Sequence, residues 1–385
     1  MKIPDPVTLL PMAQNQAKTD LAEIIATLPD SSGIYAFSAR GQAPHFSWSI
    51  NLKRRLKRLL VSSRTGVPPL LRDDVDFVKF WLTGSRLEIS LVMYELAKLY
   101  NPSGYAKQLR LRLPWFVGLT SLNAFPRLEV KNRLSRGPSH NSSAVFGPFF
   151  SRDLAQRYEQ EVLGLFQLRR CTDVLEPHAA HPGCIYGEMN QCLRPCQCAV
   201  TPEEYAGETA RVLDFLTTNG QSSATSLSIA RQKASSDMDF ELAAQIHKRL
   251  ERVTAASSTR DRSITSVDEF NGVALTPAFG ERQFRLWPML AGYWQEPVPV
   301  DLSVEALGAR SLDREIRQLL ESSLQAIPSQ SAQNQGRRVE HLALFSRWYH
   351  SSWRDGHWFP FRTLEDLNYR KLVRELSKMA TAEPC

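Results

Sequence analysis

The chain has 385 residues, a formal net charge of +7, and 43% hydrophobic against 23% charged residues. This balance excludes a wholly disordered chain and is typical of a globular protein with two or three domains. No apolar run approaches the about 18 residues of a membrane span. The opening stretch "MKIPDPVTLLPMAQ" has an Asp between two prolines where a signal peptide needs an unbroken apolar core, so we expect a cytoplasmic protein with no membrane partner.

Positive charge is concentrated in the N-terminal third of the chain. Between Asn51 and Arg136 there are 17 Lys and Arg against 6 Asp and Glu, a local excess of +11 that leaves −4 for the remainder. A basic region on a slightly acidic body predicts a phosphate-rich partner such as nucleic acid. The alternative is a charged face that only interacts with water.

The first predicted domain, residues 28–107, is a small α/β unit. It contains a strand from Gly33, a turn, a second strand, a basic helix and a further helix near Glu88 to Tyr100. Asn51 suits the N-cap of the basic helix. Four leucines at i, i+4, i+7 and i+8 predict one apolar face, made of Leu52, Leu56, Leu59 and Leu60. The rest of that helix is cationic and consists of Lys53, Arg54, Arg55, Lys57 and Arg58.

The stretches "LPDSSGIYAF" and "HFSWSINLKRRL" resemble the GIY-YIG endonuclease superfamily, and in particular the N-terminal half of the UvrC family, the incision subunit of bacterial nucleotide excision repair. The resemblance implies that Tyr35 works near the attacking water and that Arg55 holds the scissile phosphate. Both roles suit phosphodiester hydrolysis, which needs positive charge at the phosphate oxygens and a proton acceptor for water. The remaining cations of the helix, Lys53, Arg54, Lys57 and Arg58, are then expected to contact the DNA backbone.

Several residues depart from the family pattern. His45 stands where the family has its second Tyr, Ser47 replaces a glycine and Trp48 replaces a lysine. His45 is a candidate third catalytic residue because imidazole titrates near neutral pH. The alternative is that His45 is only a strand residue.

The metal-binding carboxylate of the family is the sharper departure. Alignment on Leu96 and Pro102 places Met93 at that position, and neither Glu88 nor Glu95 shares its helix face. A register anchored on Tyr105 instead would bring Glu95 near the metal position. The resemblance therefore predicts a protein that binds DNA and a UvrB-like partner with a degenerate nuclease site. Two alternatives stay open: an active magnesium- or manganese-dependent endonuclease that makes a single incision in damaged DNA, and a protein-only scaffold in a repair complex.

The second predicted domain, residues 108–200, combines a β extension with a cysteine cluster. Strands are expected in "LPWFVGLT" and "RLEV", a turn at "GPFFS", and a helix from about 153 to 167. Four cysteines in a cytoplasmic chain at irregular spacing suit zinc or an iron–sulfur cluster, and spacing alone does not decide between them. The flanking "LRRC" and "QCLRPC" resemble the UvrC family, which implies a four-iron four-sulfur cluster on Cys171, Cys184, Cys192 and Cys196. Cys198 and Cys385 fall outside this pattern.

Residues 201–258 are predicted to form a helix and a helical hairpin. Thr201, Pro202 and Glu204 predict a capped helix start. After a linker "TTNGQSSAT" come two helices, about 225–235 and 240–256, and Asp239 suits the N-cap of the second. The hairpin resembles the UVR motif of the family, which implies docking on a UvrB-like protein through Phe240, Glu241 and Ala244. The alternative is a hairpin packed on its own protein.

The last two predicted segments are 259–325, a β-rich segment that resembles UvrC only faintly, and 326–385, a linker followed by an aromatic segment. A β-hairpin is expected to turn at Phe279–Gly280, and a helix to lie near 311–325. The tryptophans of "LFSRWYHSSWRDGHWFPF" suit either base stacking or a core. The predicted fold class is α+β and multidomain: a small GIY-YIG-like α/β domain, a cysteine-rich helical region, a UVR helical hairpin and a C-terminal α+β segment.

Overall fold

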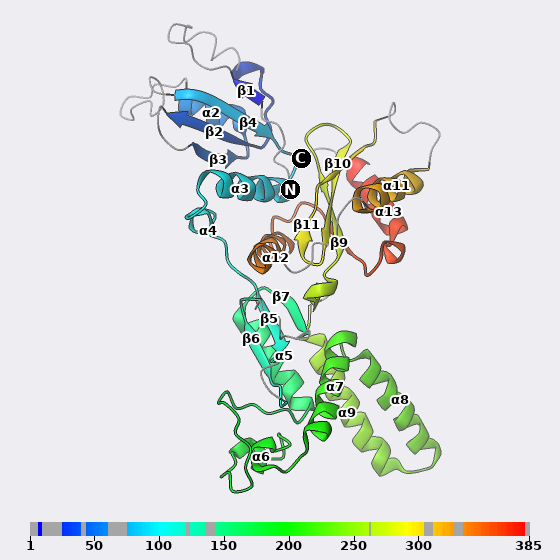
Figure 1. Cartoon of the computed structure of the whole chain (residues 1–385). Coiled ribbons are helices and arrows are strands. Elements are labelled where there is room, and N and C mark those ends of the chain that lie inside the picture. Colours follow the sequence, from blue (N-terminus) through cyan, green and yellow to red (C-terminus); the bar gives the residue numbers. More distant parts are fainter. Residues whose placement is uncertain are drawn as a thin grey trace. The chain divides into compact units, whose positions relative to one another are not determined.

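The computed structural model describes residues 7–9, 25–39, 44–60, 75–120, 124–134, 144–261, 263–303, 311–325 and 334–381. It is a mixture of helices and sheets, as predicted, and forms two compact units (Figure 1). The first unit comprises Met1–Arg112, Asn271–Ser331 and Arg347–Cys385. The second comprises Leu113–Phe270 and Ala332–Ser346. Among the helices of the described ranges, none is long and apolar enough to cross a membrane.

The first sheet of the first unit is antiparallel and has the strand order β1-β4-β2-β3. Its strands are β1 (Val7–Leu9), β2 (Gly33–Ala39), β3 (His45–Ser49) and β4 (Val75–Leu82). The associated helices are α2 (Leu52–Leu60), α3 (Arg86–Tyr100) and the short α4 (Tyr105–Gln108). Side chains alternate between the faces of a strand, so Tyr35 packs with α2 whereas Ile34 and Ala36 pack with α3. The two helices therefore cover opposite faces of this sheet.

The second sheet of the first unit has the order β11-β10-β9-β13, with β12 also paired to β10. Its strands are β9 (Gly272–Pro277), β10 (Gln283–Leu290), β11 (Tyr293–Trp294), β12 (Val298–Asp301) and β13 (His357–Pro360). The predicted hairpin at Phe279–Gly280 is confirmed, because β9 and β10 pair on either side of it and Gly280 has a φ of 119°. Helices α11 (Leu312–Gln325) and α13 (Tyr369–Thr381) pack on this sheet, and the short η3 (Leu364–Asp366) precedes α13.

The second unit contains an antiparallel sheet of order β6-β5-β7-β8. The strands are β5 (Trp115–Leu119), β6 (Leu128–Lys131), β7 (Val145–Phe149) and β8 (Thr265–Ser266). The predicted turn at "GPFFS" is wrong in its first part, because Gly147 to Phe149 pair with β5 and β8 as strand. The turn follows at Phe150, and Ser151 caps α5 (Arg152–Leu165) by accepting a hydrogen bond from the Leu154 N–H at 3.3 Å.

The helices after the cysteines complete the second unit. They are α7 (Pro202–Thr218), α8 (Gln221–Ser236) and α9 (Phe240–Ser258), and α12 (Gln335–Tyr349) belongs to this unit up to Ser346. Shorter pieces are α6 (Ile185–Glu188), η1 (Pro195–Gln197) and η2 (Val267–Glu269). The capping box of α7 is confirmed, since Thr201 Oγ1 accepts from the Glu204 N–H and the Glu204 carboxylate accepts from the Thr201 N–H.

The predicted linker "TTNGQSSAT" is wrong, because the structure continues α7 to Thr218 and starts α8 at Gln221. Only Asn219 and Gly220 lie between the helices, both with left-handed φ values of 51° and 74°. A Cβ on Gly220 would lie 2.3 Å from Ser257 Oγ, so the close approach of α9 also requires a glycine here. Two left-handed residues are enough to reverse the chain, and the polar residues around them are helical.

Candidate nucleic-acid site and cysteine cluster

The structure brings Tyr35 and Arg55 together on one face of the first sheet. Arg55 Nε–H donates a hydrogen bond to Tyr35 Oη at 3.0 Å, and the guanidinium carbon lies 5.9 Å from the ring centroid. The pair forms because α2 buries Leu52 and Leu56 against the β2 face that carries Tyr35. Tyr35 is buried, and Arg55 is half-buried above it. The pair therefore joins a phenol and a cation at the position where the resemblance expects the phosphate.

His45 lies on the same face as this pair. In the β2–β3 register His45 is opposite Phe37 and Ser47 is opposite Tyr35, and the Phe37 and His45 rings are 4.8 Å apart. Partial burial, and then the positive charge of Arg55, lower the pKa of His45 below its ordinary value. A lowered pKa leaves the imidazole neutral and able to accept a proton at physiological pH.

The basic helix α2 presents its cations to solvent. Arg54, Lys57 and Arg58 are exposed, and Lys53 is half-buried. The predicted N-cap is confirmed, because Asn51 Oδ1 accepts a hydrogen bond from the Arg54 N–H at 2.7 Å. The buried leucine face and this cap fix the helix, so the exposed cations form a surface with a defined orientation.

Met93 lies in the core of α3, on the other face of the sheet. It is 9% exposed and packs among Ile34, Ala36 and Phe46. Successive strand residues point to opposite faces, so Met93 and the Tyr35–Arg55 pair are separated by the sheet itself. The position that the alignment assigned to the metal ligand is therefore an apolar core position in this chain. Glu95, the ligand of the other register, is half-buried on the same helix.

Glu88, also on α3, is a buried acid held by a separate network. Its carboxylate accepts a hydrogen bond from the Gly84 N–H at 3.1 Å and pairs with Arg285 Nη1 of β10 at 3.1 Å. Burial raises the pKa of Glu88, the charge of Arg285 and the Gly84 N–H oppose this, and the charge of Asp355 adds to it. This pairing links α3 to the second sheet, and the sequence contains no local signal for it because the partners are far apart in the chain.

The four predicted cysteines lie in the largely irregular segment between α5 and α7. Burial raises the pKa of the Cys192 thiol, the Arg194 N–H at 3.4 Å opposes this, and the charges of Cys171, Cys184 and Cys196 raise it further. Burial, and then Cys184 and Cys171, also raise the pKa of Cys196. Cys198 is exposed and contributes to neither effect, and Cys385 lies outside the described residues.

Over the ranges that the structure describes, no three His, Cys, Asp or Glu side chains are arranged to hold a metal ion. The donor chemistry nevertheless fits a thiophilic metal, because all four are thiols, Cys192 and Cys196 are buried, and Arg194 donates an N–H to a sulfur.

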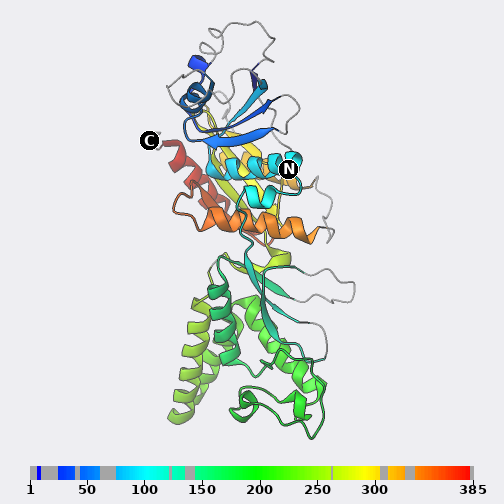
Figure 2. The same cartoon turned by 90° about the vertical axis from the view of Figure 1, so that its left-hand side faces the viewer.

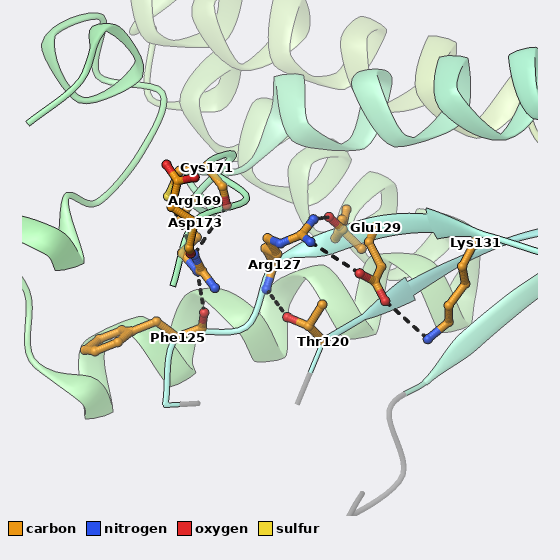
Figure 3. A network of polar contacts seen from close by, with 9 residues as sticks. Thr120, Phe125, Arg127, Glu129, Lys131, Arg169, Cys171 and Asp173 are labelled. Atoms are coloured by element: carbon orange, nitrogen blue, oxygen red, sulfur yellow. Dashed lines mark hydrogen bonds and ion pairs between the residues drawn. The ribbon is translucent and has the colours of Figure 1, made fainter. Parts of the chain in front are cut away.

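Arg169 contacts the first cysteine of the set, a contact that the sequence did not reveal. Although it is a buried cation, its guanidinium donates to the carbonyls of Phe125, Cys171 and Asp173 at 2.7, 3.3 and 3.2 Å (Figure 3). Its Nη1 also lies 3.6 Å from Cys171 Sγ. Arg169 precedes Cys171 by two residues, but only the fold shows that it is buried and aimed at the sulfur.

The helical hairpin α8–α9 has a packed base and an exposed tip. The two helices run antiparallel side by side (Figure 1 and Figure 2). Val253 and Ala256 of α9 enter the core of the second unit, whereas Phe240 is 69% exposed. The predicted cap is confirmed, since Asp239 Oδ1 accepts from the Leu242 N–H at 3.0 Å. Exposed apolar residues at the tip are Met238, Phe240 and Leu242, and Ile229 is exposed nearer the middle of α8. Glu241 and Ala244 are exposed beside them.

Comparison with known proteins gives a consistent family assignment. Residues 115–215, which contain all four clustered cysteines, match the family model "UvrC/Cho excinuclease, middle domain". The UvrABC system protein C of Rickettsia felis (strain ATCC VR-1525 / URRWXCal2) is 27% identical over 252 residues, covering 63% of this chain and 38% of that protein. The protein of the same name from Rickettsia akari (strain Hartford) is 27% identical over 267 residues, covering 67% and 40%. No solved structure gives a significant match.

The matched chain spans about two fifths of the length of these curated relatives. The family model covers the β5–β7 sheet, α5 and the cysteine segment, and it ends within α7. The cysteine pattern, its position after α5 and the relatives agree on one conclusion. The chain is similar to UvrC proteins over about two thirds of its length and matches their middle domain over residues 115–215, which supports a divergent protein of the UvrC family.

Proposed function

We propose that the chain is a nucleotide excision repair protein that binds DNA and a UvrB-like partner and has a degenerate nuclease site. The observation that carries the proposal is the Tyr35–Arg55 hydrogen bond beside the exposed cations of α2. Arg54, Lys57 and Arg58 supply charge for a phosphate backbone, and Arg55 adds a cation directly above a buried phenol. This arrangement favours DNA binding over a charged surface that only interacts with water, because the N-cap and the buried leucines of α2 fix the orientation of the cations.

The position of Met93 supports the degenerate nuclease site. Hydrolysis of a phosphodiester by this class of site needs a magnesium or manganese ion, which prefers oxygen ligands. Met93 supplies no oxygen, and its side chain packs on the face of the sheet away from Tyr35. Arg55 donates to Tyr35, so its guanidinium is partly engaged within the protein.

A four-iron four-sulfur cluster is part of the proposal, with zinc as the alternative. Cys171, Cys184, Cys192 and Cys196 would hold it through their thiolates, with Arg169 and the Arg194 N–H beside the sulfurs. When bound, a cluster supplies four metal–thiolate bonds that tie together a segment with little regular structure. Protein purified without oxygen should be brown, with about four iron and four sulfide per chain. Stoichiometric zinc without visible absorbance would rule out the cluster.

The partner is proposed to bind the tip of the α8–α9 hairpin. Phe240 projects there with most of its surface exposed, next to Glu241 and Ala244. An exposed apolar tip on a rigid hairpin suits a second helical hairpin of complementary shape. The packed base leaves the tip available, which favours docking over the alternative of a hairpin packed wholly on its own protein.

The test compares DNA binding with cutting. We expect the affinity for duplex DNA to fall steeply with added salt, because each phosphate contact releases counterions. The triple variant Arg54→Ala, Lys57→Ala, Arg58→Ala should bind DNA weakly. Its affinity should also fall less steeply with added salt (a smaller salt slope). Arg314→Ala, which removes an exposed cation from α11 in the same unit, should behave as the native protein.

The same protein should not nick damaged duplex in magnesium or manganese, with or without a UvrB-type partner. Nicking by the native protein that disappears in both Tyr35→Phe and Arg55→Ala would establish an active endonuclease instead. Loss of that nicking in Glu95→Gln would assign the metal to Glu95. Binding to the partner without salt-sensitive DNA binding would favour the protein-only scaffold.

A further inference from the structure

Trp48, Arg86 and Trp353 form an exposed stack in the first unit. The guanidinium carbon of Arg86 lies 4.5 Å from the centroid of the Trp48 ring and 6.0 Å from that of Trp353. Each tryptophan is 38% exposed, an unusual state for so large an apolar side chain. Trp48 belongs to β3, Arg86 begins α3, and Trp353 lies between α12 and β13. The fold therefore places three residues from distant parts of the chain in one cationic, aromatic surface.

The stack is held from beneath by buried groups. The Arg86 N–H donates to Asp355, and the other oxygen of that carboxylate accepts from Trp348 Nε1 at 3.1 Å. Trp348 is fully buried, so it anchors the loop that carries Trp353. Asp355 is thus occupied by these donors, and within the described parts of the chain the Arg86 guanidinium has no carboxylate partner. The result is a surface that is fixed in position and keeps its positive charge.

Charge and position indicate the ligand. A nucleobase has a π face that stacks on aromatic side chains and on arginine, and its strand is anionic. Trp48 precedes Lys53 of the basic helix by five residues, so the Cα atoms of the two residues are at most about 17 Å apart. A DNA strand that advances about 3.4 Å per nucleotide covers this distance with about five nucleotides. Trp48 is paired with Ile34 and lies on the α3 face of the sheet, whereas α2 covers the other face. Because β3 is the edge strand, a single short DNA strand would pass around this edge to contact both the stack and α2.

We propose that Trp48, Arg86 and Trp353 bind an unpaired base of a DNA strand whose phosphates lie along α2. The inference rests on the proposed DNA-binding function and adds a base-recognition site to it. Stacking is tolerant of base identity, so the site would distinguish exposed bases from paired ones and would not read sequence. An aromatic residue at position 48 is a departure of this chain from the family pattern, which has a lysine there.

The experiment measures binding of the full chain to a short single-stranded thymidine oligonucleotide by fluorescence anisotropy, next to an oligonucleotide of equal length with abasic sites in its middle. The native protein should bind the base-containing strand about fivefold or more tightly. Trp353→Ala should remove this preference, whereas Trp353→Phe should keep most of it. Phe279→Ala is the matched control, because Phe279 is 37% exposed on the β9–β10 turn of the same unit. The salt slope should stay the same in Trp353→Ala, since no phosphate contact is lost.

The outcomes separate this inference from the proposed function. Equal binding of both strands by the native protein overturns the stacking site and leaves DNA binding intact, and this comparison needs no variant. An equal loss in Trp353→Ala and Phe279→Ala also overturns it. Binding of neither strand overturns DNA binding itself, and the stacking site with it. If Trp353→Ala lowers the melting temperature but still prefers the base-containing oligonucleotide, the stacking site is overturned and Trp353 only stabilises its own loop.

Discussion

The Glu88–Arg285 pair offers a direct test of whether Glu88 is a structural acid. Glu88 lies on α3, the helix where the family resemblance expects a metal-binding carboxylate, yet it faces Arg285 of β10 at 3.1 Å. Replacing Arg285 with Met removes the cation and preserves much of the side-chain length. The carboxylate of Glu88, only 2% exposed, then keeps the Gly84 N–H as a hydrogen-bond donor but has lost its charge partner.

The magnitude follows from burial. Breaking a buried ion pair by removing one partner costs about 3–5 kcal/mol. Arg285 is 27% exposed, so solvent screens part of the pair and we expect the lower end, about 3 kcal/mol. For a unit of about 200 residues this corresponds to roughly 6–12 °C in melting temperature.

The loss should depend on pH with a definite sign. Burial raises the pKa of Glu88 in the folded protein, and Arg285 opposes that rise. An acid whose pKa is raised by folding binds more protons in the folded than in the unfolded state. Its contribution to the free energy of unfolding therefore decreases as the pH rises above the pKa that the acid has in the unfolded chain. Without Arg285 the folded pKa rises further. The difference between native protein and Arg285→Met should therefore be small near pH 4 and should grow toward neutral pH.

The assay is urea or thermal unfolding between pH 4 and 8, with Arg314→Met as the control for loss of an exposed arginine. The double variant Glu88→Gln, Arg285→Met should recover much of the stability, because no buried charge then remains unpaired. A pH-independent loss of less than about 1 kcal/mol in Arg285→Met would refute the reasoning. A stabilisation by magnesium that disappears in Glu88→Gln would show that Glu88 holds a metal.

Three further predictions concern the other sites. Cys192→Ser should lose bound metal, measured as iron and sulfide content, whereas Cys198→Ser should retain it; equal retention in both would remove Cys192 from the ligand set. Phe240→Ala should leave the melting temperature nearly unchanged, because the side chain is 69% exposed, and should weaken binding to a UvrB-type hairpin in a pull-down or titration. A large drop in melting temperature with unchanged binding would make Phe240 a core residue. Met93→Glu should destabilise the protein by about 2–4 kcal/mol in urea unfolding, because it places a carboxylate in the α3 core. Restored nicking in that variant would contradict the placement of Met93 away from Tyr35.

Local signals in the sequence predicted several elements correctly. Asn51 before a leucine-faced helix, the Thr201–Glu204 capping box, Asp239 before α9 and the turn at Phe279–Gly280 all appear in the structure. Each of these depends on residues within a few positions of one another, so the pattern contains the needed information. The same kind of reasoning failed at "TTNGQSSAT", where polar composition suggested a linker but only Asn219 and Gly220 leave the helical conformation.

Local sequence patterns therefore specified most of the helices and strands, the basic face of α2 and the family resemblance, and they singled out four cysteines as candidate ligands. Tertiary structure alone decided which side chains meet. It placed Arg55 on Tyr35, put Met93 on the opposite face of the sheet, paired Glu88 with Arg285 and aimed Arg169 at Cys171. The reason is that helix and strand periodicities specify a face but not its partner. A partner 20 or 197 positions away in the chain is chosen only when the elements pack.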